Sequence, residues 1–574
     1  MKGYEWYLAG SLEKVFPDRL PQVMREGETV YILKGETPAV QLVYGRQREM
    51  EGRLPEKYVL EAAGFPAQAR MRDVLLAPSA FPCFERRDEN YITTLPGLFP
   101  DILKPKKEET VVPMPGQYRS VWIDFPDTAS VPAGDYEVEI RLTARWAGRE
   151  EQDGSHETAE KASAGEAASW NRTLRFHINV ADVSLPEQEL LHTEWFHADC
   201  VADYYQVPVF GEAHWDALEK QIGMAAELGV NMLLTPVFTP PLDTEVGGER
   251  TTVQLVGITL EGERYSFDFS LLERWCALCR KAGIRYIEIP HLFTQWGAKA
   301  VPKIVVRENG EEKKKFGWHV AADDPSYRHF LESFLPALQE KLLELGYAKD
   351  EVYFHISDEP SREHLDSYEK ARSVAADLLE GWPVVDALSD FSFYEKGLVE
   401  QPVVANDHIQ PFADHGVEKL WVYYCCSQCV DVPNRFFAMP SARNRIMGVL
   451  MYLYDVKGFL QWGFNFYNTQ FSREHLDPFF DTHAGYAFPS GDSFLVYPGP
   501  DGTPYSSIRG QVQLEALADL GALRALEERI GRERVLEVIY EGEKAPFTFT
   551  QYPSSPFYLY ELRKRISRAL LINC

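Results

Sequence analysis

The sequence predicts a multidomain protein of the α/β plus all-β class, with an N-terminal β-sandwich followed by a (β/α)8 TIM barrel. Three observations predict it: the length of 574 residues, strand-like patterns in the first part, and a later alternation of helix, glycine and strand. We place the β-sandwich at residues 1–186 and the barrel catalytic domain at 187–535. Residues 536–574 are expected to form a C-terminal extension that ends in a helix packed on the barrel.

Alternating apolar and polar residues in the N-terminal part indicate half-buried strands. The pattern is clearest at Tyr136–Ala144, YEVEIRLTA, which follows a turn at Pro132–Gly134. Further strands are predicted at Ser120–Phe125 and Thr173–Val180. The polar stretch at 150–169, rich in small residues, is predicted to be a solvated loop.

A repeated unit of helix, glycine and strand predicts the barrel. An amphipathic helix with Trp215 and Leu228 on one face stops at Gly229, and the apolar strand VNMLLTPV follows at once. The eight predicted strands are His192–Phe196, 230–237, 284–289, 352–356, 383–388, Pro402–Ala405, Leu420–Tyr424 and Gly458–Trp462, and a closing helix is expected at Ser506–Ile530. A doubly wound open sheet is the alternative, but no G-x-G-x-x-G sequence follows a strand.

The charge balance disfavours nucleic acid and anionic membranes as partners. Lys and Arg number 59 against 86 Asp and Glu, so the formal net charge is -27. Residues Met1–Leu20 contain no secretory apolar region, and no apolar run has the length of a membrane helix, so we expect a cytoplasmic protein. The eight cysteines are too sparse for a disulfide framework, and Cys276 and Cys279 have no second metal-binding pair nearby, so buried thiols are expected there rather than zinc.

The sharpest local feature is VYFHISDEP, where a buried strand runs into Asp358 and Glu359. Barrel enzymes keep their sites at the carboxyl ends of strands. Neighbouring strand residues point to opposite sides, so both acids can face one pocket only if the strand ends there; Pro360 is expected to supply this break and to hold Glu359 extended. Two close carboxyl groups disfavour joint ionisation, so one can stay protonated as an acid while its neighbour is charged. The alternative interpretation is that the two residues form an acidic N-cap of the next helix.

Acid chemistry beside a charge suggests glycoside hydrolysis, which commonly uses a second carboxylate on another strand end. Neither the seventh strand, LWVYYCC, nor the eighth, FLQWGFNFYN, ends in a carboxylate. This favours a substrate that supplies its own nucleophile, such as a 2-acetamido carbonyl. Other acids at strand ends keep the two-carboxylate mechanism open: Asp199, Asp386, Asp390 and Asp407.

Aromatic and amide side chains gather at the same predicted strand ends. Aromatic faces suit the C–H faces of a sugar, while amides and carboxylates suit its hydroxyls. The predicted substrate-binding residues are Trp195, His197, Asp199, Gln295, Trp296, Tyr423, Trp462 and Asn465, with His291 at the same strand end as Gln295. His355 lies within its strand and is expected to be a core histidine.

An ordered set of motifs over about residues 190–509 resembles glycoside hydrolase family 123 and the wider group that shares its catalytic domain. These motifs are HISDEP, WVYYCCSQCVDVPNRFF, the arginines of Arg443–Arg445, GFLQWGFNFYN and YPGPDGTPYSSIR. The resemblance implies a β-sandwich followed by a (β/α)8 barrel. It also implies a retaining β-N-acetylgalactosaminidase that uses substrate-assisted catalysis, with neither metal nor cofactor.

The resemblance assigns roles to single residues. It implies that Glu359 is the general acid/base and that Asp358 orients the 2-acetamido group, while Trp462 and Asn465 help to form the sugar pocket. Asn434 and Arg435 also match the group and are interpreted as loop-structuring residues. The sequence departs from the family after SSIR, where GQVQLEALADLGALRALEE keeps a helix but not the family's acidic face.

The expected partner is therefore a small carbohydrate, and the sequence leaves a homo-oligomer open. One alternative is a retaining glycosidase of other specificity with an enzymic nucleophile such as Asp199 or Asp407. Another is a non-catalytic carbohydrate-binding protein on the same fold.

Overall fold

The computed structural model describes residues 4–46, 57–145 and 171–572, so the loop predicted at 150–169 and Cys574 lie outside the described residues. Two N-terminal sheets share one hydrophobic cluster, to which Val40 and Ile140 contribute from opposite sheets. The first sheet, antiparallel throughout, has the order β1 (Tyr4–Gly10), β3 (Ala39–Arg46), β8 (Tyr118–Asp124), β5 (Arg70–Ser79), β6 (Gly97–Pro105) and β23 (Ser506–Ser507). The second has the order β2 (Thr29–Lys34), β10 (Asn171–Ser184), β9 (Gly134–Arg145), β4 (Lys57–Ala63) and β7 (Thr110–Val111), with β2 and β10 parallel.

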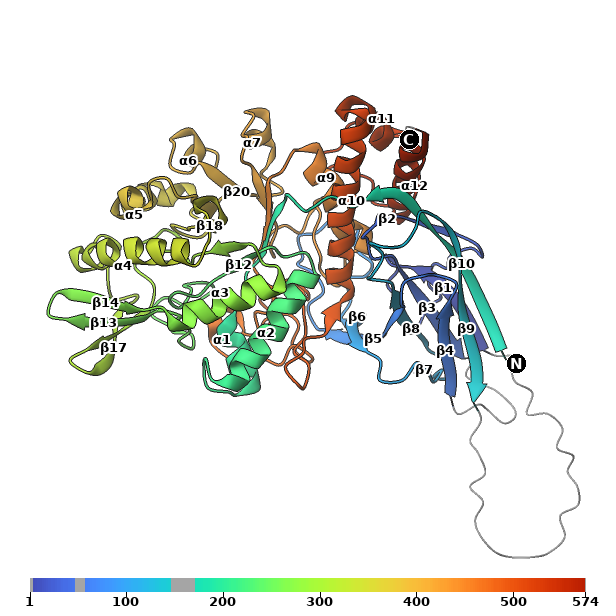
Figure 1. Cartoon of the computed structure of the whole chain (residues 1–574), viewed down its shortest axis with the longest axis horizontal. Coiled ribbons are helices and arrows are strands. Elements are labelled where there is room, and N and C mark those ends of the chain that lie inside the picture. Colours follow the sequence, from blue (N-terminus) through green and yellow to red (C-terminus); the bar gives the residue numbers. More distant parts are fainter. Residues whose placement is uncertain (1–3, 47–56, 146–170, 573–574) are drawn as a thin grey trace, which may run out of the picture.

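The predicted parallel strands form a nearly closed eight-stranded barrel (Figure 1). Their order around it is β18 (Val352–Tyr353), β15 (Tyr286–Glu288), β12 (Met232–Leu234), β11 (Leu191–Glu194), β22 (Gly458–Gln461), β21 (Trp421–Tyr423), β20 (Gln401–Ala405) and β19 (Val385–Ala387). A parallel bridge between Phe354 and Val384 joins the two end strands. All eight lie within or beside the segments predicted from the sequence.

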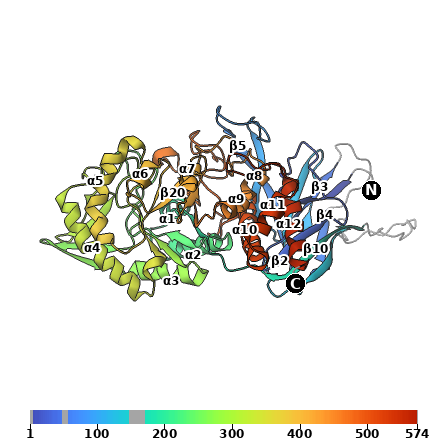
Figure 2. The ribbon, with the colours of Figure 1, turned by 90° about the horizontal axis from the view of Figure 1, so that it is seen from above.

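Helices follow the strands and cover the outside of the barrel (Figure 2). They are α1 (Ala198–Tyr205), α2 (Glu212–Glu227), α3 (Ser270–Ala282), α4 (Pro325–Glu344), α5 (Leu365–Ala375), α6 (Ser392–Glu395), α7 (Gln410–Asp414), α8 (Ser441–Arg445), α9 (Met447–Leu453) and α10 (Ile508–Ile530). Gly283 ends α3 in the left-handed conformation, with a φ of 87°, and the chain then turns into β15. Gly458 is needed for packing, because a Cβ there would lie 2.1 Å from the Trp421 ring.

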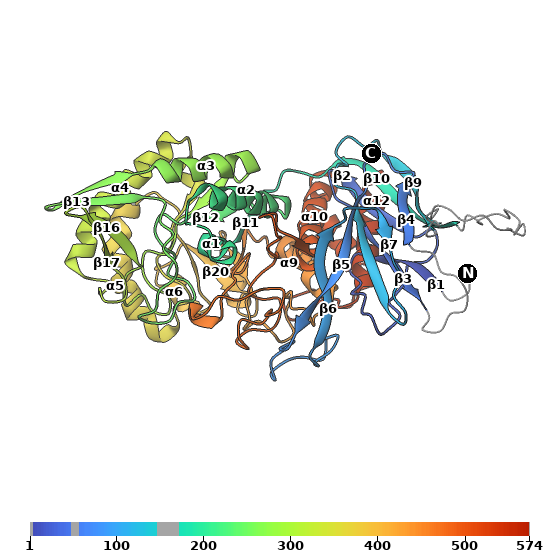
Figure 3. The same cartoon turned by 90° about the horizontal axis from the view of Figure 1, so that it is seen from below.

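Two hairpins that the sequence analysis missed form a four-stranded sheet at the end of the barrel remote from the N-terminal sheets (Figures 1 and 3). The strands are β13 (Gly257–Glu261), β14 (Arg264–Asp268), β16 (Ile304–Glu308) and β17 (Glu311–Phe316). The second hairpin turns at Asn309–Gly310, a sequence typical of tight β-turns. No helix in the described parts of the chain has the length and apolar character needed to cross a membrane.

The C-terminal segments join the barrel to the N-terminal sheets. Strand β23 pairs with β6, and α10 lies between the two parts of the molecule (Figures 1 and 2). After α11 (Arg532–Tyr540), the final helix α12 (Pro556–Ile572) contacts α10 and also β2 and β10. The final helix therefore covers the five-stranded sheet, and its Arg563 forms an ion pair with Glu36, two residues beyond the end of β2.

Candidate active site

A cavity opens at the carboxyl ends of the barrel strands, and it occupies about 780 Å³ when the space open to solvent is included. Trp195 lines it directly after β11, Trp462 directly after β22, and Tyr423 at the end of β21. The full set of lining residues is Trp195, Leu242, Asp243, Gln295, Trp296, Asp358, Glu359, Ala387, Tyr423, Cys425, Cys426, Ser427, Leu460, Trp462, Gln470 and Phe488. The size of the cavity and its mixture of aromatic and polar walls suit a small ligand that has both apolar faces and hydroxyl groups.

Asp358 and Glu359 both face this cavity because the chain leaves strand geometry before it reaches them. Strand β18 ends at Tyr353, and Glu359 has a φ of 43°, in the left-handed region that side chains rarely adopt. The prediction that Pro360 would hold Glu359 extended is therefore wrong. The backbone N–H of Glu359 donates to the Ala387 carbonyl of β19 at 3.1 Å, and this bond fixes the turn against the neighbouring strand. Strained backbone of this kind is concentrated at functional sites.

The two carboxyl groups have different polar neighbours. The Tyr423 hydroxyl donates to Glu359 Oε1 at 2.6 Å. Burial raises the pKa of Glu359, and the hydrogen bond from Tyr423 opposes this rise. Burial and the adjacent Glu359 raise the pKa of Asp358 well above its usual range, while the positive charge of His355 opposes the rise. Burial thus raises the pKa of both carboxyl groups, and their proximity disfavours the charged form of both at once.

The structure brings together seven of the ten predicted site residues, namely Asp358, Glu359, Trp195, Gln295, Trp296, Tyr423 and Trp462. Gln295 is held by its Oε1, which accepts from the Asp243 N–H at 2.7 Å. Its buried Nε2 makes no hydrogen bond within the described residues. A buried amide donor beside a cavity is well placed to bind a ligand oxygen.

The other three predicted residues, among those the structure describes, lie behind the cavity wall rather than in it. Asp199 forms a buried ion pair with Arg250, and the same guanidinium contacts His197 Nδ1 at 3.0 Å. Asn465 Oδ1 accepts from the His197 N–H at 2.7 Å. These contacts fix the segment between Trp195 and α1. The side chains of His197, Asp199 and Asn465 therefore help to position the cavity wall that Trp195 forms.

The sequence analysis missed Asp243, a carboxylate that lines the cavity from the loop after β12. Burial raises its pKa to about 6, and its Oδ2 accepts from the Phe471 N–H at 3.1 Å. A strand pattern marks only the residues at the end of the strand, and Asp243 lies nine residues beyond Leu234, the last residue of β12. Gln470 and Phe488 were missed for the same reason, since they come from long loops after β22.

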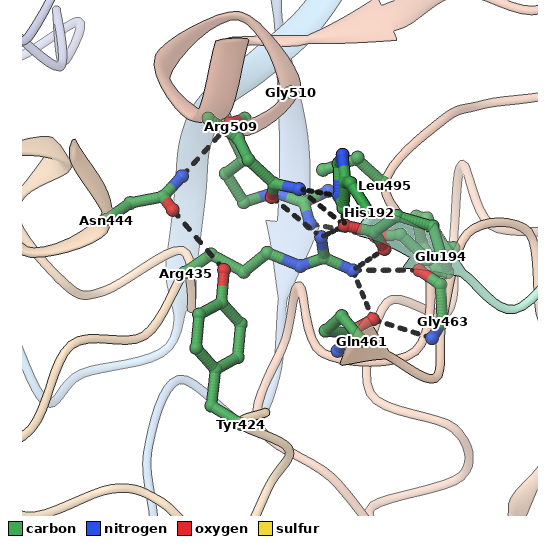
Figure 4. Close-up of polar contacts among 12 residues, drawn as sticks. His192, Glu194, Tyr424, Arg435, Asn444, Gln461, Gly463, Leu495, Arg509 and Gly510 are labelled. Atoms are coloured by element: carbon green, nitrogen blue, oxygen red, sulfur yellow. Dashed lines mark hydrogen bonds and ion pairs between the residues drawn. The ribbon is translucent and has the colours of Figure 1, made fainter. Parts of the chain in front are cut away.

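Arg435 ties together the strands that carry the two tryptophans of the cavity (Figure 4). Its guanidinium donates to both carboxylate oxygens of Glu194, at 2.7 and 3.0 Å, and also to Gln461 Oε1 and to the Gly463 carbonyl. Glu194 directly precedes Trp195, while Gln461 and Gly463 flank Trp462. The fully buried guanidinium therefore fixes the spacing between the ends of β11 and β22.

Asn434 behaves as a loop-structuring residue. Its Nδ2 donates to the carbonyls of Cys425 and Gln428 at 2.8 and 2.7 Å. This closes the loop whose residues Cys425 to Ser427 form one wall of the cavity. All seven cysteines in the described ranges are free thiols, including Cys276 and Cys279 in the interior of α3.

The remaining predicted acids are engaged elsewhere. Asp386 is fully buried and accepts from the Ile356 N–H at 2.9 Å. Asp390 accepts from the Ser392 N–H at the start of α6, and Asp407 accepts from His408 and Gln428. Asp386 also belongs to a group with His291 and His355 whose donor atoms lie within 4.8 Å of one another. The two imidazole rings are tilted by 31° with centroids 4.3 Å apart, and His355 Nε2 contacts Glu288.

A parallel barrel with an acid pair, tryptophans and a tyrosine at the carboxyl ends of its strands defines a glycoside hydrolase site. The family model described as the catalytic domain of glycoside hydrolase 123 matches residues 195–526, more than half of the chain. The chain therefore belongs to glycoside hydrolase family 123.

One solved structure agrees with this assignment at the level of the fold. A family 123 glycoside hydrolase from Clostridium perfringens, from a study of glycolipid glycan hydrolysis, superposes with a TM-score of 0.71 at 14% identity over 100% of this chain and 98% of that chain. Xylanase 10B from Clostridium thermocellum reaches a TM-score of 0.31 at 10% identity over 90% of this chain and 94% of that chain, too low to carry an argument. Comparison with curated proteins gives no match.

Proposed function

We propose that this protein is a retaining glycosidase that removes terminal β-linked N-acetylgalactosamine, or a related 2-acetamido sugar, from small glycosides by substrate-assisted catalysis. The observation that carries the proposal is the turn at Glu359, which directs two adjacent carboxyl groups into one cavity. Adjacent acids suit an acid that protonates the leaving group and a neighbour that holds the reacting amide.

Each residue has a defined step in this mechanism. Glu359 gives its proton to the glycosidic oxygen while the acetamido carbonyl oxygen attacks the anomeric carbon, and the bond to the leaving group breaks. The Asp358 carboxylate accepts the amide N–H and faces the positive oxazolinium that forms. Glu359 then takes a proton from water, which attacks the anomeric carbon while the bond from that carbon to the acetamido oxygen breaks, so the amide is regenerated and the original configuration is restored. The exposed edge of the cavity at Trp296, which is 37% exposed, leaves room for the departing group.

Asp243 supports a second candidate, a retaining glycosidase with an enzymic nucleophile and no need of the acetamido group. It lines the cavity, close enough to raise the pKa of Asp358. Asp199, the nucleophile considered from the sequence, is neutralised by Arg250. Asp243 is therefore the residue to test against substrate assistance.

Hydrolysis of aryl β-glycosides with and without a 2-acetamido group distinguishes the two mechanisms. Substrate assistance predicts turnover of the 2-acetamido substrates alone, inhibition by a thiazoline analogue, and a loss of about 10²–10⁴-fold or more in Glu359→Gln. Asp243→Asn should then retain most of its kcat, since the Asn still accepts from Phe471. Turnover of plain glycosides that disappears in Asp243→Asn would establish the second candidate. Unchanged turnover in Glu359→Gln would exclude Glu359 as the acid/base of either mechanism, and no turnover of any aryl β-glycoside by wild type would favour a binding protein.

A further inference from the structure

A hydrogen bond joins Asp243 and Gln295 at the wall of the cavity. The Asp243 N–H donates to Gln295 Oε1 at 2.7 Å. Both residues line the cavity, and they come from the loops after β12 and β15, which are neighbouring strands of the barrel. The bond therefore holds two cavity residues from different loops together.

This bond leaves Gln295 with an unused donor. A backbone N–H can donate to the oxygen of an amide but not to its nitrogen, so the orientation of the Gln295 amide is fixed. The residue is only 4% exposed, and its buried Nε2 makes no hydrogen bond to any described residue. A buried donor without a partner is unfavourable, and a ligand atom that accepts from Nε2 removes this cost.

Asp243 adds an unused acceptor to this donor. Its Oδ2 accepts from the Phe471 N–H at 3.1 Å, and its backbone carbonyl accepts from the Ser472 hydroxyl at 2.7 Å. No group of the described residues donates to Oδ1, so this carboxylate oxygen is left for a ligand. Burial raises the pKa of Asp243 to about 6, which still leaves the group ionised, and therefore an acceptor, at neutral pH.

The segment that carries Gln295 is also fixed relative to Asp358. The Ser357 hydroxyl donates to the Thr294 carbonyl at 2.8 Å, and the Trp296 N–H donates to the Asp358 carbonyl at 3.0 Å. The residues on both sides of Gln295 are thus bonded to Asp358 and to the residue before it. The unused donor therefore keeps a set position relative to the two adjacent acids.

A hydroxyl group matches this combination of donor and acceptor. It can accept from the amide and donate to the carboxylate at the same time, whereas a carbonyl oxygen only accepts and an ammonium group only donates. We propose that Asp243 and Gln295 form a specificity-determining pair that binds one hydroxyl group of the terminal 2-acetamido sugar. This inference rests on the proposed function, because it concerns the sugar that the reaction removes.

The test combines a change in the side chain with a change in the substrate. The kcat/KM of wild type and Asp243→Asn is measured on an aryl 2-acetamido β-glycoside and on its 3-, 4- and 6-deoxy analogues. The Asn oxygen has to face the Phe471 N–H, so its NH₂ group replaces Oδ1 and cannot accept from the hydroxyl. On the parent substrate kcat/KM should fall by about 10- to 150-fold, the range for a hydrogen bond to a charged group, mainly through KM. On one deoxy analogue it should hardly change.

A second variant and a control accompany this measurement. Gln295→Met removes the donor, and the same deoxy analogue should be the substrate that does not respond to it, so this variant carries the test if Asp243→Asn does not fold. Glu245→Gln is the matched control. Glu245 lies in the same loop as Asp243, but it is exposed, pairs with Arg473 and does not line the cavity. Its substitution should leave the relative kcat/KM values of the four substrates unchanged.

The outcomes separate the inference from the proposed function. Equal losses on the parent and on every deoxy analogue, or a different unresponsive analogue for each variant, overturn the inference while wild-type turnover leaves the proposed function intact. A collapse of kcat on all substrates in Asp243→Asn also overturns it, because a nucleophile behaves in that way. A wild type that hydrolyses only plain aryl glycosides overturns the proposed function, and the deoxy analogues of those glycosides then test the pair. Hydrolysis of no aryl glycoside overturns both.

Discussion

Replacing Arg435 by Met tests whether this guanidinium holds the two tryptophan-bearing strands in place. Arg435 donates to Glu194, Gln461, Gln513 and Gly463, and both it and Glu194 are fully buried. The Met side chain fills much of the space but leaves the Glu194 carboxylate without its cation. Breaking a buried pair from one side costs about 3–5 kcal/mol, so we expect a loss of that size in the free energy of unfolding.

A double-mutant cycle separates the ion pair from simple loss of packing. Arg435→Met, Glu194→Gln and the double variant are unfolded in urea, followed by tryptophan fluorescence, and their kcat/KM values are measured in parallel. The double variant should be more stable than the sum of the two single losses predicts, because it contains no unpaired buried charge. Losses that add without coupling would refute the reasoning. The kcat/KM of Arg435→Met should also fall, since Trp195 and Trp462 adjoin the residues that Arg435 binds.

Three further predictions concern pH and packing. Burial raises the pKa of Glu359 and the Tyr423 hydroxyl lowers it, so Tyr423→Phe should move the alkaline limb of kcat/KM to higher pH; an unmoved limb would exclude this hydrogen bond from the reaction. Folding raises the pKa of His355 to about 9, so its contribution to stability is present below about pH 6.5 and is lost as the pH rises through 9, which thermal melts of wild type and His355→Gln can check. A Cβ at Gly448 would lie 1.9 Å from a carbonyl oxygen of α10, so Gly448→Ala should destabilise by about 1–3 kcal/mol, whereas Gly223→Ala, with no heavy atom of the described residues within 4 Å, should not.

The barrel strands were predictable because each is a local pattern: an apolar run directly after a helix and a glycine. The four-stranded sheet was missed although its second hairpin contains Asn309–Gly310, because the run of charged residues at 311–315 obscures the strand alternation. The helical segment before β19 is divided into α5 and the short 3₁₀ turns Arg362–His364 and Ala376–Leu379, since a helical pattern does not show where tertiary contacts break it.

The site was predictable where a side chain's position follows from a strand end, as for Asp358, Tyr423 and Trp462. It was not predictable where a distant residue decides the orientation. Asp199 follows a strand as expected, but Arg250 pairs with it from 51 positions away in the sequence and turns it from the cavity. Asp243 shows the converse, because a loop of irregular backbone places it at the site and no periodic pattern marks such a position.

The pairing of β23 with β6 has a consequence for any attempt to divide the chain. Excision of the first 186 residues would leave Ser506 and Ser507 as an unpaired edge, deprive Arg509 of its buried partner Asp101, and strip α12 of the surface it covers. The α10 segment that completes the barrel would thus lose the support at its start. The N-terminal sheets are therefore part of the scaffold of the hydrolase rather than a detachable accessory, and any shortened or recombined version of the protein should retain them.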